Sequence, residues 1–468
     1  MSIDEAASPT LIAGQPASAP PLSHRPGRWI DNWDAEDNDQ WSSVGKSIAK
    51  RNLQWSIACE FLGFVVWQLW SIVVVYLPAA GFTFSTSQIF WLISMPSLVG
   101  ATLRIPYTFM VPRFGGRNWT IISALLLLIP SIGLALCVSN PETPFGVMLA
   151  VAALAGFGGG NFASSMANIT FFYPAREKGW ALGLNAAGGN LGAAVAQLVV
   201  PIAVALGAAA TLNLPLAGWI WVPLILAAAF GAWKYMDNLS NAKTDFAGSL
   251  AAVREPHLWI MALLYIGTFG SFIGFAGVFP KLIVDSFPEF STIAMGPATL
   301  SLAFLGPLVG SLARPFGGRL ADRFGGAFIT VAAFAVMAAI ALSVVWTLPL
   351  SNFWLFLGLF LVLFAAAGAG NGATYRMIPV IFARRGAAAG SAELRESVST
   401  ARKSAAALGL ISAVGAYGGF LIPQVLNASK GASGSYDGAF YGFVAGYVVM
   451  LAVTWFFYLR RSSTLGKV

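Results

Sequence analysis

The sequence predicts an all-α membrane protein in which twelve transmembrane helices form two pseudo-symmetric bundles of six helices each. The composition, the length of the apolar stretches and an internal repeat lead to this prediction. Hydrophobic residues make up 57% of the 468 residues and charged residues only 10%, whereas a soluble domain carries about 25% charged residues. A chain this apolar fits a lipid bilayer, which a helix of about 20 apolar residues can cross.

Twelve apolar stretches have about this length and set the expected order of the helices. The predicted spans are 54–77, 87–111, 119–139, 145–168, 179–208, 216–236, 257–280, 294–314, 326–347, 352–376, 404–427 and 438–460. The longest polar break between the central spans is Asp237–Pro256. The expected domains are a mostly disordered cytoplasmic tail at 1–44, a six-helix bundle at 45–236, a cytoplasmic linker at 237–256, a second six-helix bundle at 257–460 and a cytoplasmic tail at 461–468.

The basic residues predict the orientation of the chain in the membrane. The net charge is +8, and most Lys and Arg residues fall in the termini and in the loops of one side. The opposite loops hold only Lys281 and Lys430, so the positive-inside rule places both termini in the cytoplasm. Basic residues spread over every inner loop do not form one nucleic-acid-binding face. Cys59 and Cys137 both fall in predicted spans, which gives no support to a disulfide framework, a metal site or cysteine catalysis.

Two arginines inside apolar helices stand at the centre of the internal repeat. ATLRIPYTFMVPRFGG (101–116) matches GSLARPFGGRLADRFGG (310–326) at an offset of 210 residues, so that Arg104 corresponds to Arg314. Asn161 and Asn371 follow these arginines by 57 residues each. A charge at membrane depth costs about 2.5–3.5 kcal/mol even on the lower scales, and we find no carboxylate in the middle of a predicted span to pair with either arginine. Two related halves that each place a positive charge in the membrane predict an anionic substrate.

Several motifs resemble those of a known family of transporters. They are GATLRIPYTFMVPRFGGR (100–117), GFGGGNFASSMANITFFYP (156–174), ALGLNAAGGNLG (181–192), HLWIMALLYIGTFGSFIGF (257–275), GSLARPFGGRLADRFGG (310–326) and GLISAVGAYGGFLIP (409–423). Together they resemble the bacterial nitrate/nitrite porters of the major facilitator superfamily, over nearly the whole chain from about Trp33. The inner-loop motif GGRLADRFGG by itself indicates only the superfamily. The resemblance implies the major facilitator fold and transport of nitrate and nitrite across a bacterial inner membrane, without a cofactor or a metal.

The resemblance also implies roles for single residues. The two arginines would clamp the anion, and a guanidinium suits nitrate because it is planar, stays charged and donates two parallel hydrogen bonds. Aromatic rings above and below would admit a planar anion and crowd a tetrahedral one. The candidate substrate-binding residues are Arg104, Arg314, Phe162, Tyr265, Phe269, Asn190, Asn161 and Ser412. The alternative for the aromatic residues is ordinary helix packing, and for the asparagines it is a hydrogen bond between helices. The expected partners of a monomer are the two anions and the lipid bilayer.

Two coupling modes remain open at this point. Facing arginines repel each other in a low dielectric, so an empty carrier should resist closing, and this makes nitrate/nitrite antiport the first hypothesis. The alternative, nitrate/proton symport, needs a titratable group such as Glu60 or His257. Because Glu60 lies about six residues into the first predicted span, we expect its carboxylate to reach the inner interface or to pair with a nearby basic residue. A membrane enzyme is disfavoured, since we find no histidine, cysteine pair or mid-membrane carboxylate near the arginines. An anion channel is disfavoured because the two-fold repeat and the hinge-like glycines fit alternating access better than a continuous pore.

Overall fold

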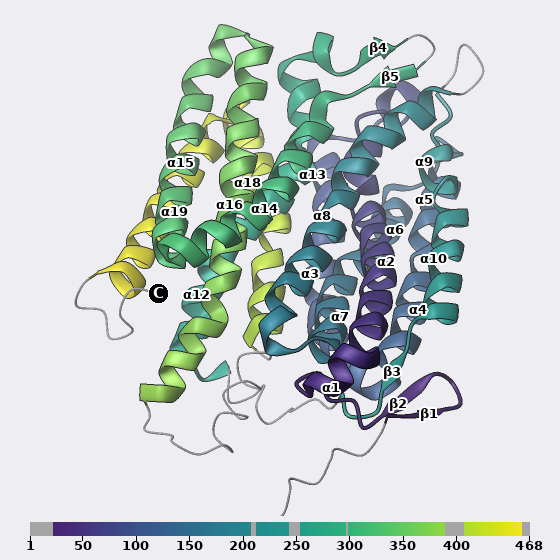
Figure 1. The fold of residues 1–468 in the computed structure, drawn as a ribbon. Coiled ribbons are helices and arrows are strands. Elements are labelled where there is room, and N and C mark those ends of the chain that lie inside the picture. The colour runs from purple at the N-terminus through teal and green to yellow at the C-terminus, as the bar shows by residue number, and fades with distance from the viewer. Residues whose placement is uncertain (1–21, 207–211, 243–252, 296–297, 389–406, 461–468) are drawn as a thin grey trace, which may run out of the picture.

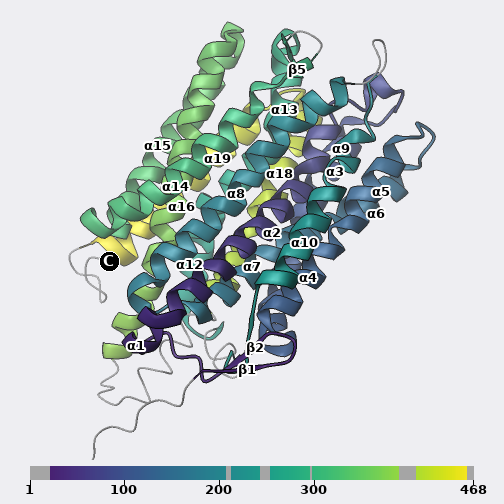
Figure 2. The same ribbon diagram turned by 45° about the vertical axis from the view of Figure 1, so that its right-hand side comes forward.

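The chain folds almost entirely into long helices that run side by side. A computed structural model describes residues 22–206, 212–242, 253–295, 298–388 and 407–460. Within them, eleven helices are long and apolar enough to cross a membrane. Helices of the first half lie mainly on the right of Figure 1 and those of the second half mainly on the left, and the turned view of Figure 2 keeps this separation. The predicted class, an all-α membrane protein, is confirmed.

The first half contains six spans, three of which are broken into two helices. Its helices are α2 (Lys46–Val73), α3 (Thr86–Phe114), α4 (Gly116–Leu126), α5 (Leu128–Val138), α6 (Phe145–Leu154), α7 (Gly156–Phe172), α8 (Ala175–Ala205), α9 (Leu216–Trp219) and α10 (Val222–Tyr235). Helix α3 begins with a capping box, in which Ser85 and Gln88 satisfy each other's backbone N–H groups. It ends at Gly115, whose φ of 88° is one that residues with a Cβ rarely adopt.

The second half repeats this arrangement. Its helices are α12 (Pro256–Tyr265), the π-helical turn η3 (Ile266–Gly270), α13 (Ser271–Ser286), α14 (Leu305–Phe324), α15 (Gly326–Thr347), α16 (Phe353–Ala388), α18 (Gly418–Ser433), α19 (Asp437–Thr454) and η7 (Trp455–Leu459). Gly325, which corresponds to Gly115 in the repeat, ends α14 with a φ of 93°. The same glycine-dependent turn therefore follows the arginine helix in both halves.

The eighth predicted span, 294–314, is displaced in the structure. The strands β4 (Ile293–Met295) and β5 (Ala298–Leu300) pair as a hairpin before α14 begins. Helix α14 then continues to Phe324 and carries four charged residues, Arg314, Arg319, Asp322 and Arg323. With 20 residues it is long enough to span a bilayer, and together with the eleven apolar helices it makes twelve among the described residues, as expected. Hydropathy located the span too early because it favoured the apolar hairpin over the charged end of the helix.

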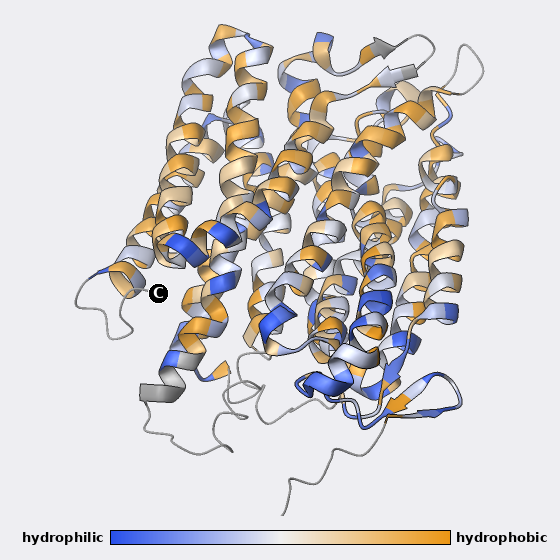
Figure 3. Cartoon of the chain, in the orientation of Figure 1, coloured by the Kyte–Doolittle hydropathy of each residue, from blue (hydrophilic) through white to orange (hydrophobic). Residues whose placement is uncertain are grey.

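The N-terminal segment is more ordered than predicted. We expected residues 1–44 to be mostly disordered, and residues 1–21 lie outside the described part. The remainder forms strands β1 (Ser23–Arg25) and β2 (Trp29–Asp31), the helical turns α1 (Asn38–Gln40) and η1 (Trp41–Gly45), and a sheet with β3 (Asn238–Leu239). Figure 3 shows this hydrophilic segment at the lower end of the molecule. The ordered structure of this segment could not be predicted from its own sequence, because polar contacts with distant residues hold it in place.

Asp237 is the main anchor of this segment. Its carboxylate accepts hydrogen bonds from Arg28 Nη2 at 2.7 Å, Arg51 Nη2 at 2.6 Å and Asn52 Nδ2 at 2.9 Å. The segment and the end of the sixth span are thus joined to the start of α2. The linker predicted at 237–256 therefore begins with residues that belong structurally to the first half, and residues 243–252 lie outside the described part.

Equivalent glycines bring the helices of each half together. A Cβ on Gly158 of α7 would lie 2.0 Å from the backbone oxygen of Gly63 of α2. A Cβ on Gly368 of α16 would lie 2.1 Å from the backbone oxygen of Gly310 of α14. Gly158 and Gly368 are related by the repeat offset of 210 residues. Small residues allow such close approach of membrane helices, and here they fix the arginine-bearing helix α14 against its neighbour.

Candidate anion-binding site

Both repeat arginines are buried. Arg104 of α3 is 0% exposed and Arg314 of α14 is 5% exposed. A proline follows each arginine within two residues, Pro106 in α3 and Pro315 in α14. In the part of the chain that the structure describes, no ion pair joins either arginine to a carboxylate. A buried guanidinium without a paired carboxylate is costly to keep, so the groups that surround each arginine matter.

Arg104 connects the two halves directly. Its Nε donates to the backbone oxygen of Gly159 at 3.1 Å, and its Nη1 donates to the backbone oxygen of Ser412 at 2.9 Å. Its guanidinium carbon lies 4.5 Å from the ring centre of Phe162 and 4.8 Å from that of Phe269, which is the distance of a cation–π contact. These contacts fix its orientation and leave Nη2 without a hydrogen-bond partner.

Arg314 approaches the same ring from the second half. Its guanidinium carbon lies 5.7 Å from the ring centre of Phe162 and 5.6 Å from that of Tyr375. Its Nη1 has no hydrogen-bond partner in the part of the chain that the structure describes. Phe162 therefore contacts both guanidinium groups, and each group retains a free N–H donor. An anion at this point could accept hydrogen bonds from both halves.

The aromatic residues form one continuous stack. The rings of Phe162 and Phe269 have centres 6.0 Å apart and an interplanar angle of 25°. Tyr265 stacks on Phe269 at 5.3 Å and lies 6.0 Å from Tyr375. We expected flat rings above and below a planar anion, which requires two contacts of about 3.5 Å each and hence a ring separation of about 7 Å. In this conformation Phe162 and Phe269 pack on each other and on Arg104, so an anion between them would have to separate the rings.

Three buried asparagine side chains also lack hydrogen-bond partners. Both side-chain polar atoms of Asn161, Asn190 and Asn371 have no hydrogen-bond partner among the described residues. All three are at most 3% exposed. Because buried polar groups are nearly always hydrogen-bonded, these unsatisfied amides are candidates to bind a small polar ligand.

Comparison with known proteins identifies the family. The family model described as Major Facilitator Superfamily matches residues 59–401. The chain is 42% identical to the "Nitrate/nitrite transporter NarU" of Escherichia coli (strain K12), over 92% of this chain and 96% of that protein. It is 37% identical to the "Probable nitrate/nitrite antiporter NarK2" of Thermus thermophilus, over 94% and 99% of the two chains. The chain belongs to the nitrate/nitrite porters of the major facilitator superfamily.

Solved structures of other transporters share this fold. The xylose transporter XylE from E. coli, in an inward open conformation, superposes with a TM-score of 0.62 at 13% identity, covering 86% of this chain and 95% of that one. A bacterial homologue of the human lysosomal transporter Spinster superposes with a TM-score of 0.61 at 17% identity, covering 86% and 95%. Membership of this family of porters also confirms that the protein is a transporter and not an enzyme.

The structure brings most of the predicted porter-site residues together. Arg104, Arg314, Phe162, Phe269, Tyr265 and Ser412 form one connected group through the contacts above. Asn161 instead lies against α2, where a Cβ on Gly63 would be 3.2 Å from its Nδ2. Asn190 is buried in α8, next to Gly189. Within the described part of the chain, no hydrogen bond joins either asparagine to an arginine, and their place in the anion site stays a prediction.

Sequence reasoning missed two further candidates for this site. The ring centre of Tyr375 lies 5.6 Å from the guanidinium carbon of Arg314, and the buried amide of Asn371 has no hydrogen-bond partner among the described residues, like that of Asn161. Both could have been found. Asn371 is the repeat counterpart of Asn161, and Tyr375 follows it by four residues, which places both on one face of α16.

We predicted that Glu60 reaches the inner interface or pairs with a basic residue, and the structure contradicts this. Helix α2 begins at Lys46, not near residue 54, so Glu60 lies about 21 Å along the helix and is 1% exposed. Its Oε2 accepts hydrogen bonds from Ser165 Oγ and from Asn185 Nδ2. No ion pair joins it to a basic residue in the described part of the chain. The prediction that Glu60 lies at the interface or in an ion pair is therefore wrong. It failed because α2 begins earlier than the predicted span and includes the basic residues that precede residue 54.

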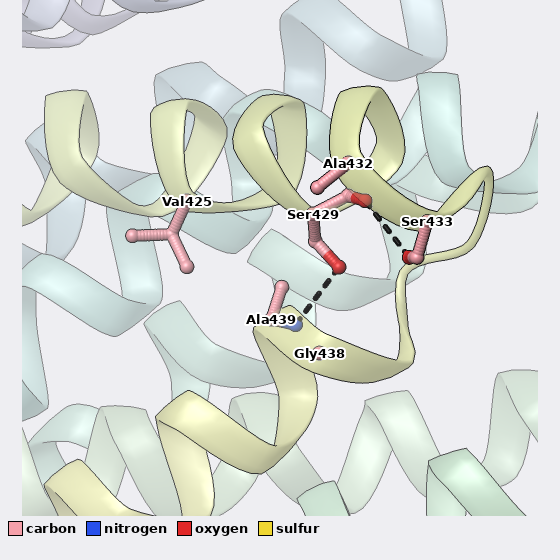
Figure 4. A pocket seen from close by; sticks show the side chains of 6 residues that line it. All are labelled: Val425, Ser429, Ala432, Ser433, Gly438 and Ala439. Carbon is pink, nitrogen blue, oxygen red and sulfur yellow. Dashed lines mark hydrogen bonds between the residues drawn. The ribbon is translucent and has the colours of Figure 1, made fainter.

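A separate pocket lies away from these residues. It is lined by α18 and the start of α19, through Val425, Ser429, Ala432, Ser433, Gly438 and Ala439 (Figure 4). Ser429 Oγ accepts a hydrogen bond from the backbone N–H of Ala439, and Ser433 Oγ donates to the backbone oxygen of Ser429. The pocket has no charged lining residue, and its hydroxyl groups already have partners, so it has no feature of an anion site.

Proposed function

We propose that the protein carries nitrate and nitrite across a bacterial inner membrane by alternating access, as a nitrate/nitrite antiporter that takes nitrate in and releases nitrite. The observation that supports this proposal most strongly is the pair of buried arginines, one from each half, that contact the same ring of Phe162. The orientation with both termini in the cytoplasm rests on the distribution of basic residues.

The chemistry of the two anions fits this pair. Nitrate and nitrite are small, planar and weakly basic, and a guanidinium offers them two parallel N–H donors where an ammonium offers only a point charge. Each arginine keeps one donor without a partner. An anion bound to Arg104 Nη2 and Arg314 Nη1 would therefore complete the hydrogen bonding of both groups.

The arrangement also provides a physical reason for exchange. The anion would lie between charges that belong to different halves, so it would attract the halves toward each other. Without it, the two positive charges repel across a low-dielectric site. The occupied carrier should therefore reorient more readily than the empty one. The name of the Thermus thermophilus relative, a probable nitrate/nitrite antiporter, supports this coupling.

Contacts between the halves at one end of the molecule must break during such a cycle. Gln424 Nε2 of α18 donates to Ser94 Oγ of α3 at 2.6 Å, and Asn427 Nδ2 donates to Ser87 Oγ at 3.2 Å. Ser87 and Ser94 lie toward the start of α3, whereas the other end of this helix, at Gly115, lies against Trp29 of the N-terminal strand β2. We expect the end with Ser87 and Ser94 to face the periplasm and to be closed in this conformation.

Uptake into reconstituted vesicles tests the proposal. Vesicles loaded with nitrite and without a pH gradient should take up labelled nitrate faster than vesicles loaded with sulfate. Vesicles without the protein give the background. Equal nitrate uptake with nitrite and with sulfate inside would contradict antiport, and no saturable nitrate uptake in any vesicle would contradict nitrate transport itself.

A second coupling mode, nitrate/proton symport, is favoured by one observation, the buried carboxyl group of Glu60. The other titratable candidate, His257, lies at the start of α12, where its Nδ1 is 2.9 Å from Tyr458 Oη. Glu60 is linked to the anion site more directly, because Ser165, which bonds its carboxyl group, also bonds the backbone oxygen of Phe162. We therefore assign proton coupling in this second mode to Glu60.

A further inference from the structure

Glu60 is a buried ionisable group that the anion site does not explain. It lies well inside α2, and its side chain packs on the backbone of α8 so closely that a Cβ on Gly189 would be 2.4 Å from Oε1. That oxygen has no hydrogen-bond partner. An ionised carboxylate kept in such a place needs nearby positive charge or several donors. Two donors on one oxygen satisfy it only in part.

The hydrogen bonds around Glu60 can serve both of its protonation states. When it is ionised, Oε2 accepts from Ser165 Oγ and from Asn185 Nδ2, the latter at 2.6 Å. When it is protonated, it can donate to Ser165 Oγ, because that hydroxyl group has a second acceptor in the backbone oxygen of Phe162 at 3.2 Å. A serine hydroxyl both donates and accepts. Neither state of Glu60 therefore requires the helices to move.

The charges that act on Glu60 are those of the anion site. Ser165, which bonds Glu60, also donates to the backbone oxygen of Phe162, and the ring of Phe162 contacts both guanidinium groups. Arg314 of α14 and Arg104 of α3 therefore act electrostatically on the Glu60 carboxyl group, and so does Tyr375 of α16. From α7 and α8, the groups that face it are Ser165 and Asn185, which carry no charge. Its neighbour Cys59 points to α10, where its Sγ contacts the backbone oxygen of Ala228. The arginine pair is thus the positive charge that a buried Glu60 carboxylate would feel.

We propose that Glu60 is an internal counter-anion of the arginine pair, and that it takes up a proton when nitrate or nitrite binds. This inference rests on the proposed anion site. In the anion-free carrier, one carboxylate would partly neutralise two guanidinium groups. A second negative charge entering this site favours the neutral form of Glu60. By linkage, a protonated Glu60 favours anion binding to the same extent.

The proposal joins the two coupling modes in one carrier. During exchange, an anion and its proton enter and another anion and its proton leave, so no net proton movement is seen. During net uptake, the empty carrier returns with an ionised Glu60 that reduces the repulsion between the arginines. One proton then enters with each anion. Glu60 would therefore permit slow proton-coupled uptake beside fast exchange.

The pH dependence of nitrate binding tests this inference on the whole protein in detergent. Nitrate is the probe because it does not itself titrate in this range. In the wild-type protein, the Kd for nitrate should rise about tenfold per pH unit over the range in which Glu60 is ionised before binding and protonated in the nitrate-bound protein. Glu60→Gln should bind nitrate with a Kd that does not change with pH. Glu60→Asp, which keeps a carboxyl group, should restore the dependence, and Glu142→Gln, at an exposed residue, should leave it unchanged.

Measuring the protons taken up by the wild-type protein on nitrate binding tests the inference without any variant. Adding nitrate to weakly buffered wild-type protein should make the solution more alkaline, by up to one proton per bound anion. Nitrate binding without proton uptake, or the same pH dependence in Glu60→Gln as in wild type, would overturn the inference and leave the anion site in place. Absence of nitrate binding at every pH would instead overturn the proposed function.

Discussion

Replacing Arg314 with lysine separates the shape of the guanidinium from its charge. Arg314→Lys keeps a positive charge on α14 but removes the planar pair of donors. Arg314 suits this test better than Arg104, because it donates to no backbone oxygen of the described residues, whereas Arg104 donates to the backbone oxygens of Gly159 and Ser412. The lysine variant should therefore lose anion affinity without leaving a backbone oxygen unpaired.

The expected loss follows from the hydrogen bonding. A bidentate arginine makes two charge-assisted hydrogen bonds to an oxyanion, and a lysine at the same position makes one. One such bond contributes about 1.5–3 kcal/mol, which corresponds to a loss of nitrate affinity of about 10- to 100-fold. The contact with Phe162 at 5.7 Å adds little to this difference, because an ammonium can also lie over a ring.

Nitrate titration of the purified protein, by calorimetry or by the rise in melting temperature with bound ligand, measures this loss. Arg319→Lys is a matched control, since Arg319 lies on the same helix but is exposed and should keep wild-type affinity. A folded Arg314→Lys protein with nitrate affinity within twofold of wild type would refute the assignment of Arg314 to the anion site.

Three further predictions follow from the packing. Phe162→Ala should weaken nitrate binding and admit tetrahedral oxyanions such as sulfate, because its ring contacts both arginines; competition by sulfate in the nitrate titration measures this. Gly158→Ala should lower the melting temperature clearly, since its Cβ would lie 2.0 Å from a backbone oxygen, whereas Gly318→Ala has open space and should be tolerated. Asp237→Asn should release the N-terminal strands at a cost of about 1–3 kcal/mol, seen as faster proteolysis of that segment with nitrate binding unchanged.

The fold could be predicted from the sequence because the bilayer imposes a simple rule on it. Apolar stretches of the right length and the 210-residue repeat gave the two halves and the positions of Arg104 and Arg314. The boundaries were less certain where charged residues continue a helix, as in α14 and at the start of α2. Hydropathy cannot show that a helix extends past the apolar region. For the same reason the start of α2 was predicted too late, and Glu60 was expected too close to the interface.

Contacts between distant segments could not be predicted. The order of the N-terminal segment depends on Asp237, which follows it by about 200 residues. The polar surroundings of Glu60 come from Ser165 and Asn185 on two other helices. Residues related by the repeat were the exception, since Asn371 could have been inferred from Asn161. Internal symmetry therefore carries tertiary information that a local pattern does not.

The position of a bound nitrate ion tests the central claim most directly. A structure determined with saturating nitrate should show one anion between the two halves, within hydrogen-bond distance of Arg104 Nη2 and Arg314 Nη1, about 2.7–2.9 Å. The rings of Phe162 and Phe269 should move apart from their present 6.0 Å if the anion enters between them. An anion that contacts only one arginine, or that binds elsewhere in the protein, would contradict the proposal that the two halves share one substrate ion.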